Sequence, residues 1–220
     1  EQDRNKGTRR HNSIYDNTGT RALRTLGAGM MAGATSPARP WFRLGTADPE
    51  LNRYAPVKLW LNDVTERMQL VFQKSNTYRT LHGIYEELGA FGTAGSIILP
   101  DPKTAIHHYP VTVGEYAVAQ DYQGRINTLY REFQKTVGEV VSEFGYKKCS
   151  TSVKNLFDRG SLDTWITIIH AIEPREDRER DFKKKDNMNM AYKSCYFELG
   201  GDGEQLLREG GFKDFPAVIP

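Results

Sequence analysis

The chain has 220 residues, with 30 Lys and Arg against 28 Asp and Glu, a formal net charge of +2 at pH 7. Its apolar fraction of 38 % excludes a disordered or fibrous protein and indicates an ordinary globular fold. The near-neutral balance argues against a protein whose main task is wrapping nucleic acid, because phosphate binding needs a clear excess of cations.

Positive charge is concentrated at the start of the chain. Residues 1–43 hold eight basic and three acidic side chains, a local charge of +5, and residues 1–19 are predicted to form a basic lead-in arm. This arm could bind nucleic acid or a partner, or it could simply be a solvated approach to the first helix. The longest uncharged stretch, Thr25 to Ala38, has 14 residues, whereas a membrane span needs about 20, so we expect no membrane partner.

Helical spacing of apolar residues predicts three helices in the first half of the chain. The first runs from about Thr20 to Ala34. Its glycines indicate that another backbone packs closely against it, because each costs roughly 1 kcal/mol in a helix: Gly27, Gly29 and Gly33. Residues 41–44 read as a short extended piece.

The second helix, at about 56–74, is the clearest, and we expect one apolar stripe to pack on a sheet as core: Trp60, Val64, Met68 and Val71. The third begins at Asn76 or Thr77, either of which can cap it, and ends at Gly89.

From Gly95 onward the pattern predicts strands. The expected strands are 96–99, 114–120, 125–134, 163–173 and 190–199, with a hairpin turn at 121–124. Thr136 and Glu139 form a capping box for a short helix that Gly145 ends, and a second short helix covers about 152–159. Helices first and mostly antiparallel strands afterwards predict an α+β domain over 20–220.

A charged loop is predicted inside the last hairpin. Residues 173–186 contain 12 charged side chains, six of each sign, which cannot bury apolar surface. We therefore expect residues 174–187 to be a mobile loop.

Common catalytic signatures are not met. The spacing of Gly27, Gly29 and Gly33 misses the dinucleotide fingerprint by one residue and follows no strand, which favours helix packing. His107 and His108 are adjacent, so in an extended segment they point to opposite faces and cannot share one metal ion. Neither cysteine, Cys149 nor Cys195, has a second ligand at metal-binding spacing or a base to activate it. Two cysteines also form no disulfide framework, which favours a reducing, intracellular compartment.

Other titratable and aromatic residues have plainer interpretations. His170 shares a strand face with isoleucines and is expected to be a satisfied or edge histidine, and Glu86 and Glu87 are expected to solvate their helix. Four tyrosines could stack on nucleic-acid bases but are more typical of a half-buried sheet: Tyr109, Tyr116, Tyr122 and Tyr130. No catalytic residue, metal ligand or cofactor is predicted from these patterns.

Several blocks of the sequence resemble the head-to-tail connecting proteins, or portal proteins, of short-tailed bacteriophages. The longest block covers residues 18–42, from Thr18-Gly19-Thr20-Arg21 to Arg39-Pro40-Trp41-Phe42. Further blocks lie at 54–68, 88–94, 109–116, 121–133, 170–175 and 211–216. The resemblance therefore extends over nearly all of the chain from Thr18 onward.

The resemblance implies a non-enzymatic structural subunit without a cofactor. Portal proteins form rings, usually of twelve subunits, at one vertex of the capsid, where double-stranded DNA enters and leaves. The implied partners are further copies of the chain, capsid protein, scaffolding protein, terminase and tail adaptor proteins. The implied location is the virion, after assembly in the host cytoplasm.

Within the family, this chain corresponds to the wing, the outer α+β part, and we expect the clip and stem to lie beyond Pro220. Two other classes stay open from the residues alone. One is an enzyme domain with a dispersed active site, and the other is a nucleic-acid-binding module that uses residues 1–43.

Overall fold

The computed structural model describes residues 16–176, 181, 183–184, 186–201 and 205–220. The chain divides into two compact units, each considered by itself. The first comprises Ser13–Val113 and Ala217–Pro220 and is called the helical unit; the second contains Gly114–Pro216 and is called the sheet unit. Helices and antiparallel sheets together confirm the predicted α+β class. The predicted arm at 1–19 lies outside the described residues except for its last four positions.

Helix α1 (Thr18–Ala34) packs against helix α4 (Thr77–Phe91) in the helical unit. A Cβ added at Gly27 would lie 2.8 Å from Glu86 Cγ, which confirms the close approach predicted for this glycine. The prediction is wrong for Gly29 and Gly33, where an added Cβ meets nothing within 4 Å, because both lie away from α4. Glu86 was expected only to solvate its helix, but its stem fills the space that Gly27 leaves.

Replacing Gly27 and Gly29 separately by Leu tests this packing. We expect Gly27→Leu to destabilise the helical unit by about 1–3 kcal/mol, the usual cost of overpacking a tight contact. Gly29→Leu is the matched control and should be neutral or stabilising, because leucine is the better helix former. Urea unfolding followed by circular dichroism measures both; equal stabilities for the two variants would contradict the assigned contact.

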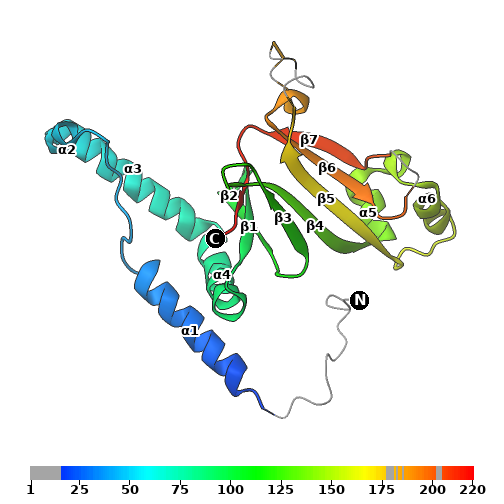
Figure 1. Cartoon of the computed structure of the whole chain (residues 1–220), viewed down its shortest axis with the longest axis horizontal. Coiled ribbons are helices and arrows are strands. Elements are labelled where there is room, and N and C mark those ends of the chain that lie inside the picture. Colours follow the sequence, from blue (N-terminus) through cyan, green and yellow to red (C-terminus); the bar gives the residue numbers. More distant parts are fainter. Residues whose placement is uncertain (1–15, 177–180, 182, 185, 202–204) are drawn as a thin grey trace. The chain divides into compact units, whose positions relative to one another are not determined.

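Helix α3 (Ala55–Lys74) follows the five-residue helix α2 (Pro49–Arg53), and Figure 1 shows α2 at the end of α3 remote from α4. The buried side of α3 is covered largely by the chain that precedes it. Rings of Trp41 and Phe42 lie 6.0 and 5.8 Å from the ring of Phe72, and the Leu44 backbone N–H donates to Thr65 Oγ1 at 3.3 Å. Residues 41–44 join no strand ladder.

The predicted core stripe of this helix is wrong at Trp60, whose side chain is 62 % exposed. Met68 is also exposed, whereas Val64 and Val71 are half-buried. Leu61 and Thr65 are the buried residues of α3, so the buried face is rotated away from the predicted stripe. The spacing of apolar residues predicted the helix correctly, but it did not specify which face of α3 the neighbouring segments cover.

A three-stranded antiparallel sheet completes the helical unit, in the order β2-β1-β8. Its strands are β1 (Gly95–Asp101), β2 (Ala105–Val111) and β8 (Ala217–Val218). Asn76 uses its side chain on strand β2 rather than on the helix it precedes. Its Oδ1 accepts from the His108 N–H at 2.9 Å, and its Nδ2 donates to the His108 carbonyl at 2.7 Å. Asn76 thus occupies the predicted cap position without making a side-chain cap hydrogen bond.

Helix α4 continues through Gly89, where the sequence predicted its end. The helix ends at Gly92, whose φ of 75° is the left-handed conformation that glycine adopts readily. Gly89 instead permits close packing, since an added Cβ would lie 2.8 Å from Leu26 Cδ2.

The sheet unit is a five-stranded antiparallel sheet in sequential order, β3-β4-β5-β6-β7. Its strands are β3 (Tyr116–Gln120), β4 (Ile126–Thr136), β5 (Trp165–Pro174), β6 (Tyr192–Glu198) and β7 (Arg208–Phe212). The predicted hairpin is confirmed: the Asp121 carboxylate accepts from the N–H groups of Gln123 and Arg125 at 2.8 and 2.9 Å. Strand β7 was not predicted.

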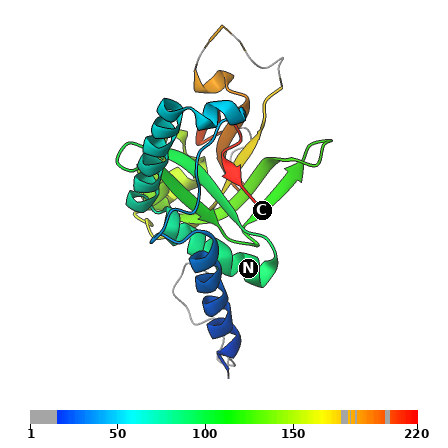
Figure 2. The same cartoon turned by 90° about the vertical axis from the view of Figure 1, so that its left-hand side faces the viewer.

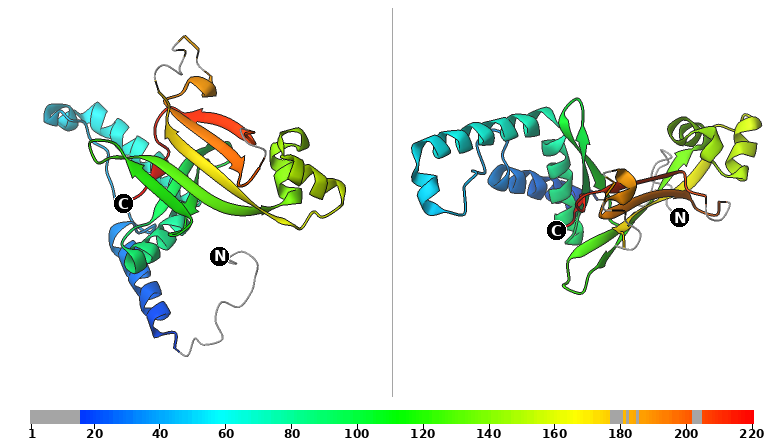
Figure 3. Two further views of the ribbon diagram at one scale, coloured as in Figure 1. Left: turned by 45° about the vertical axis from the view of Figure 1, so that its right-hand side comes forward. Right: turned by 90° about the horizontal axis from the view of Figure 1, so that it is seen from above.

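Helices α5 (Val137–Phe144) and α6 (Thr151–Asp158) lie at one end of this sheet, as Figure 3 shows. The turn η1 (Tyr146–Lys148) joins them. They enclose the main core with buried residues of the sheet and of the loop before β7: Val137, Val140, Phe144, Cys149, Val153, Ile168 and Leu207. The predicted capping box of Thr136 and Glu139 is present at the start of α5. This local motif fixes where the helix that carries Val137, Val140 and Phe144 begins.

The charged loop at 174–187 lies partly outside the described residues. Within the described part, Asp181 Oδ2 and Lys184 Nζ form an ion pair at 3.7 Å. The turn η3 (Asn187–Asn189) leads into β6. The mobility of the loop at 174–187 stays a prediction.

Candidate functional site

One row of side chains crosses all five strands of the sheet unit. Successive cross-strand pairs join Tyr116 to Arg131, Arg131 to His170, His170 to Tyr196, and Tyr196 to Arg208. Directly paired residues point to the same face of a sheet, so the register brings five distant positions into one row. The row gathers two tyrosines, two arginines and one histidine on one face of the sheet.

His170 lies at the centre of the row and is 2 % exposed. Its Nε2 lies 2.9 Å from Ser194 Oγ, and its ring stacks on Tyr196 at 3.9 Å with an interplanar angle of 9°. Burial, together with the positive charges of Arg131 and Arg208, lowers the pKa of His170 to about 3. His170 is therefore neutral near pH 7 and lies on a central strand, so it is not an edge histidine. The prediction of a satisfied histidine holds only for Nε2, because Nδ1 is buried without a hydrogen-bond partner among the described residues.

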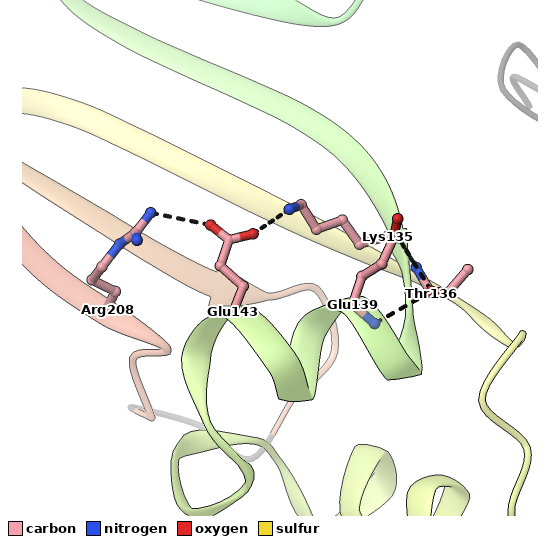
Figure 4. Close-up of polar contacts among 5 residues, drawn as sticks. All are labelled: Lys135, Thr136, Glu139, Glu143 and Arg208. Atoms are coloured by element: carbon pink, nitrogen blue, oxygen red, sulfur yellow. Dashed lines mark hydrogen bonds and ion pairs between the residues drawn. The ribbon is translucent and has the colours of Figure 1, made fainter. Parts of the chain in front are cut away.

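Arg208, at the other end of the row, links the sheet to α5. Figure 4 shows Glu143 of α5 between Lys135 of β4 and Arg208 of β7, and it forms an ion pair with each. The distance from Arg208 Nη2 to Glu143 Oε1 is 3.4 Å. The Arg208 guanidinium also lies 4.4 Å from the ring centre of Tyr196 and 5.1 Å from that of Phe144. Partly exposed ion pairs contribute little stability individually, so the arrangement mainly fixes orientation.

Removing the Thr136 hydroxyl tests the capping box at the start of α5. The Thr136 N–H donates to Glu139 Oε2 at 2.9 Å, while the Glu139 N–H donates back to Thr136 Oγ1 at 3.4 Å (Figure 4). We expect Thr136→Ala to lower the free energy of unfolding by about 1 kcal/mol. Thr136→Ser retains the hydroxyl and serves as the control. The Glu139 carboxylate accepts from the Thr136 N–H and also from the Thr136 hydroxyl, at 3.2 Å, and both hydrogen bonds lower the pKa of Glu139. Because only the hydroxyl is lost in Thr136→Ala, the difference between the two variants should shrink when acid protonates Glu139.

The paired histidines occupy opposite faces of strand β2, as predicted. His108 is buried, with Nε2 3.0 Å from Thr77 Oγ1, while the His107 ring lies edge-on to Tyr109 at 4.6 Å. Burial lowers the pKa of His108. These two histidines do not converge on one ion.

The cysteines lie in environments that favour the neutral thiol. Burial raises the pKa of Cys149, whose Sγ donates to the Gly145 carbonyl at 3.4 Å. Burial likewise raises the pKa of Cys195. A thiol is nucleophilic only as thiolate, so neither environment activates its cysteine.

The four tyrosines differ in their surroundings. Tyr109, Tyr116 and Tyr130 lie on strands, with Tyr130 donating to Glu173 Oε2 at 2.6 Å, a hydrogen bond that raises the pKa of Tyr130 to about 12. The expectation of sheet packing is wrong for Tyr122, which is 94 % exposed in the β3–β4 turn.

Two kinds of site are absent from the part of the chain that the structure describes. There, no group of three or more His, Cys, Asp or Glu side chains is placed to hold a metal ion. Among the same residues, no helix combines the length and the apolar character needed to cross a bilayer.

The helical unit exposes large apolar side chains, which we call the α2–α3 patch: Leu51, Tyr54, Leu59, Trp60 and Leu70. Each is between 46 and 70 % exposed. Sequence spacing missed this patch because it assigned Trp60 to the core. Extended exposed apolar surface is typical of a protein-protein contact.

The comparisons with known proteins cover the entire chain. A family model described as bacteriophage head to tail connecting protein matches residues 1–220. The chain is 63 % identical over 219 residues to a protein named "Probable portal protein" from Bordetella phage BPP-1, covering 100 % of this chain and 39 % of that relative. It is 45 % identical over 218 residues to a protein named "Portal protein" from Salmonella phage epsilon15, covering 99 % of this chain and 39 % of that relative. The chain thus spans 39 % of the length of these two relatives.

Proposed function

This chain belongs to the bacteriophage head-to-tail connecting protein family, and on that basis we propose that it contributes to a structural portal subunit. The observation that carries the proposal is the match of the whole chain to the family model, together with two relatives that are named portal proteins. Such a subunit is one copy in a ring at a capsid vertex, which provides the channel for genome packaging and ejection and holds the tail.

A structural role also agrees with the chemistry of the sheet unit. The relatives are named for a structural component, which points away from an enzyme. His170 is neutral and buried, and the two cysteines are unactivated thiols, so none of these residues supports a reaction. The α2–α3 patch instead offers a surface on which another protein can bind.

The proposed partners follow from the role of a portal. They are further copies of the chain, usually twelve in all, capsid protein, scaffolding protein, terminase, tail adaptor proteins and double-stranded DNA in the channel. The proposed location is the portal vertex of the virion, after assembly in the host cytoplasm. Within the subunit, residues 20–220 form the wing-like part and require no cofactor.

Labelling of purified virions tests the proposal. An epitope inserted after Tyr122, an exposed turn residue, should be detected by immunogold at one vertex of the phage particle, beside the tail. A nonsense mutation in the gene should yield heads that contain no packaged DNA. Label distributed over all vertices, or full heads in the nonsense mutant, would contradict a portal role.

A further inference from the structure

We infer that the sheet unit binds one chloride ion between three side chains on neighbouring strands, Tyr116, Arg131 and His170; this inference does not depend on the proposed function. Strands β3, β4 and β5 lie side by side (Figures 1 and 2), and their register pairs Tyr116 with Arg131 and Arg131 with His170. Side chains of directly paired residues share one face, with Cβ atoms about 4.5–5.5 Å apart. The three side chains are therefore within reach of a single small ligand.

Each of these side chains has a buried polar atom that lacks a hydrogen-bond partner. The atoms are Tyr116 Oη, Arg131 Nε and His170 Nδ1, and none of them is paired within the described residues. His170 as a whole is 2 % exposed, so bulk solvent does not reach its free nitrogen. Unpaired buried polar atoms destabilise a fold, and three of them at adjacent positions of one row point to a bound ligand.

All three atoms can donate a hydrogen bond to the same acceptor. The Arg131 Nε–H and the Tyr116 hydroxyl are donors. The positive charge of Arg131 helps to lower the pKa of His170, so the two groups are close and the imidazole is neutral. Its Nε2 lies 2.9 Å from Ser194 Oγ. We assign the Ser194 hydroxyl as the donor in that hydrogen bond, which leaves the ring proton on Nδ1 and makes Nδ1 the third donor.

The charge of Arg131 favours an anion as the ligand. Lys135 and Arg208 on the same face both pair with Glu143, whereas Arg131 makes no ion pair with any residue that the structure describes. Its guanidinium is half-buried and lies over the apolar ring of Phe133, 4.7 Å from the ring centre. A partly buried cation without a counter-ion is unfavourable. An anion would neutralise this charge, which a water molecule does not.

The size and charge of the site favour chloride among the anions. Because the three donor atoms are all buried, a ligand that contacts all of them is enclosed and has to be small. The single positive charge of Arg131 is balanced by a single negative charge. A spherical ion accepts hydrogen bonds from every direction, whereas a carboxylate oxygen accepts mainly near its own plane and brings carbon atoms that need room. Chloride therefore suits this donor set best.

Chlorine NMR of the natural full-length protein tests the inference, because chloride that exchanges with a site on a large protein gives a broadened line. We expect Arg131→Met to weaken chloride binding at least tenfold and so to remove most of the broadening. The matched control is Arg125→Met, which removes the same charge from the exposed turn between β3 and β4 and should bind like the wild type. Equal broadening in wild type and Arg131→Met overturns the inference. Binding by the wild type that needs molar chloride is an adventitious ion only, and it overturns the inference as well.

Tyr116→Phe provides a second variant that keeps the aromatic ring and removes only one donor. It should bind chloride about tenfold more weakly than the wild type, because a hydrogen bond to a charged group is among the stronger ones. Tyr122→Phe removes a hydroxyl from an exposed tyrosine and should leave the affinity unchanged. Wild-type affinity in Tyr116→Phe overturns the three-donor site. Acetate should displace chloride far less well than bromide does, and equal displacement would overturn the assignment to a halide.

Bromide shows directly which atoms surround the ion. Crystals of the full-length protein soaked in bromide should give one anomalous difference peak per chain, between Tyr116, Arg131 and His170. A peak at that place without anomalous signal is an ordered water molecule and overturns the inference. Each of these results leaves the portal role unaffected.

Discussion

Acidification from pH 6.5 to pH 4 should destabilise the sheet unit by about 3 kcal/mol through His170, since one pKa unit corresponds to about 1.4 kcal/mol. The folded protein holds this imidazole neutral, with a pKa of about 3, because it is buried beside two arginines. In the unfolded chain, His170 has its ordinary pKa of 6.5 and therefore binds a proton when the pH falls below that value. Stability from this residue is therefore complete above pH 6.5 and is lost as the pH falls toward 3.

The variant His170→Phe isolates this contribution. Phenylalanine keeps an aromatic ring on Tyr196 but cannot titrate, so the variant should lose less stability between pH 6.5 and pH 4 than the wild type. Urea unfolding at several pH values measures the slope for each protein, and carboxylate contributions cancel in the difference. Identical slopes would show that His170 is accessible to protons in the folded state.

Truncation of the sheet-unit core should have the largest effect of any single substitution considered, with Ile168→Ala costing about 2–5 kcal/mol. Ile168 of β5 is 0 % exposed and belongs to the core that this strand forms with helices α5 and α6. Trp60→Ala, by contrast, should change the stability of the unassembled chain by less than about 1 kcal/mol, because Trp60 is already exposed.

Chemical unfolding of the unassembled chain compares the two variants directly. Comparable losses for Ile168→Ala and Trp60→Ala would show that the outer face of α3 is core, as its sequence spacing suggested. A loss confined to Ile168→Ala would support the assignment of Trp60 to the surface.

Local chemistry made part of this fold predictable. The capping box of Thr136 and Glu139 and the left-handed or turn glycines Gly124 and Gly145 depend on residues within four positions of one another. The long runs that form β4, β5 and β6 are also recognisable, because their apolar residues suit a buried sheet. These features need no knowledge of the rest of the chain.

Long-range packing explains what the sequence did not reveal. Residues 41–44 pack on α3, and Leu26 of α1 packs on Gly89 within α4; both contacts join segments that are far apart in the sequence. Strand β7 contains two glycines, and only its ladder with β6 defines it. Helix α2 has a local signal in the sequence, since Asp48 before Pro49 is a favourable helix start.

In the candidate surfaces, too, the residues can be recognised in the sequence but their arrangement depends on long-range packing. The individual residues of the row through His170 are visible in the sequence, but their alignment depends on the register of five strands. The large apolar residues of the α2–α3 patch are visible in the sequence, because both faces of helix α3 carry such residues. What distinguishes its face from the core is the chain segment that covers the opposite side.

We propose that this chain is part of a ring-forming structural subunit. Native mass spectrometry of the natural full-length protein tests it most directly, because the mass of a closed assembly gives the number of subunits without any assumption about shape. The account predicts one large closed ring, with twelve copies as the expected number for a portal. A protein that stays monomeric or dimeric at every concentration, or that forms open chains of all lengths, would contradict it.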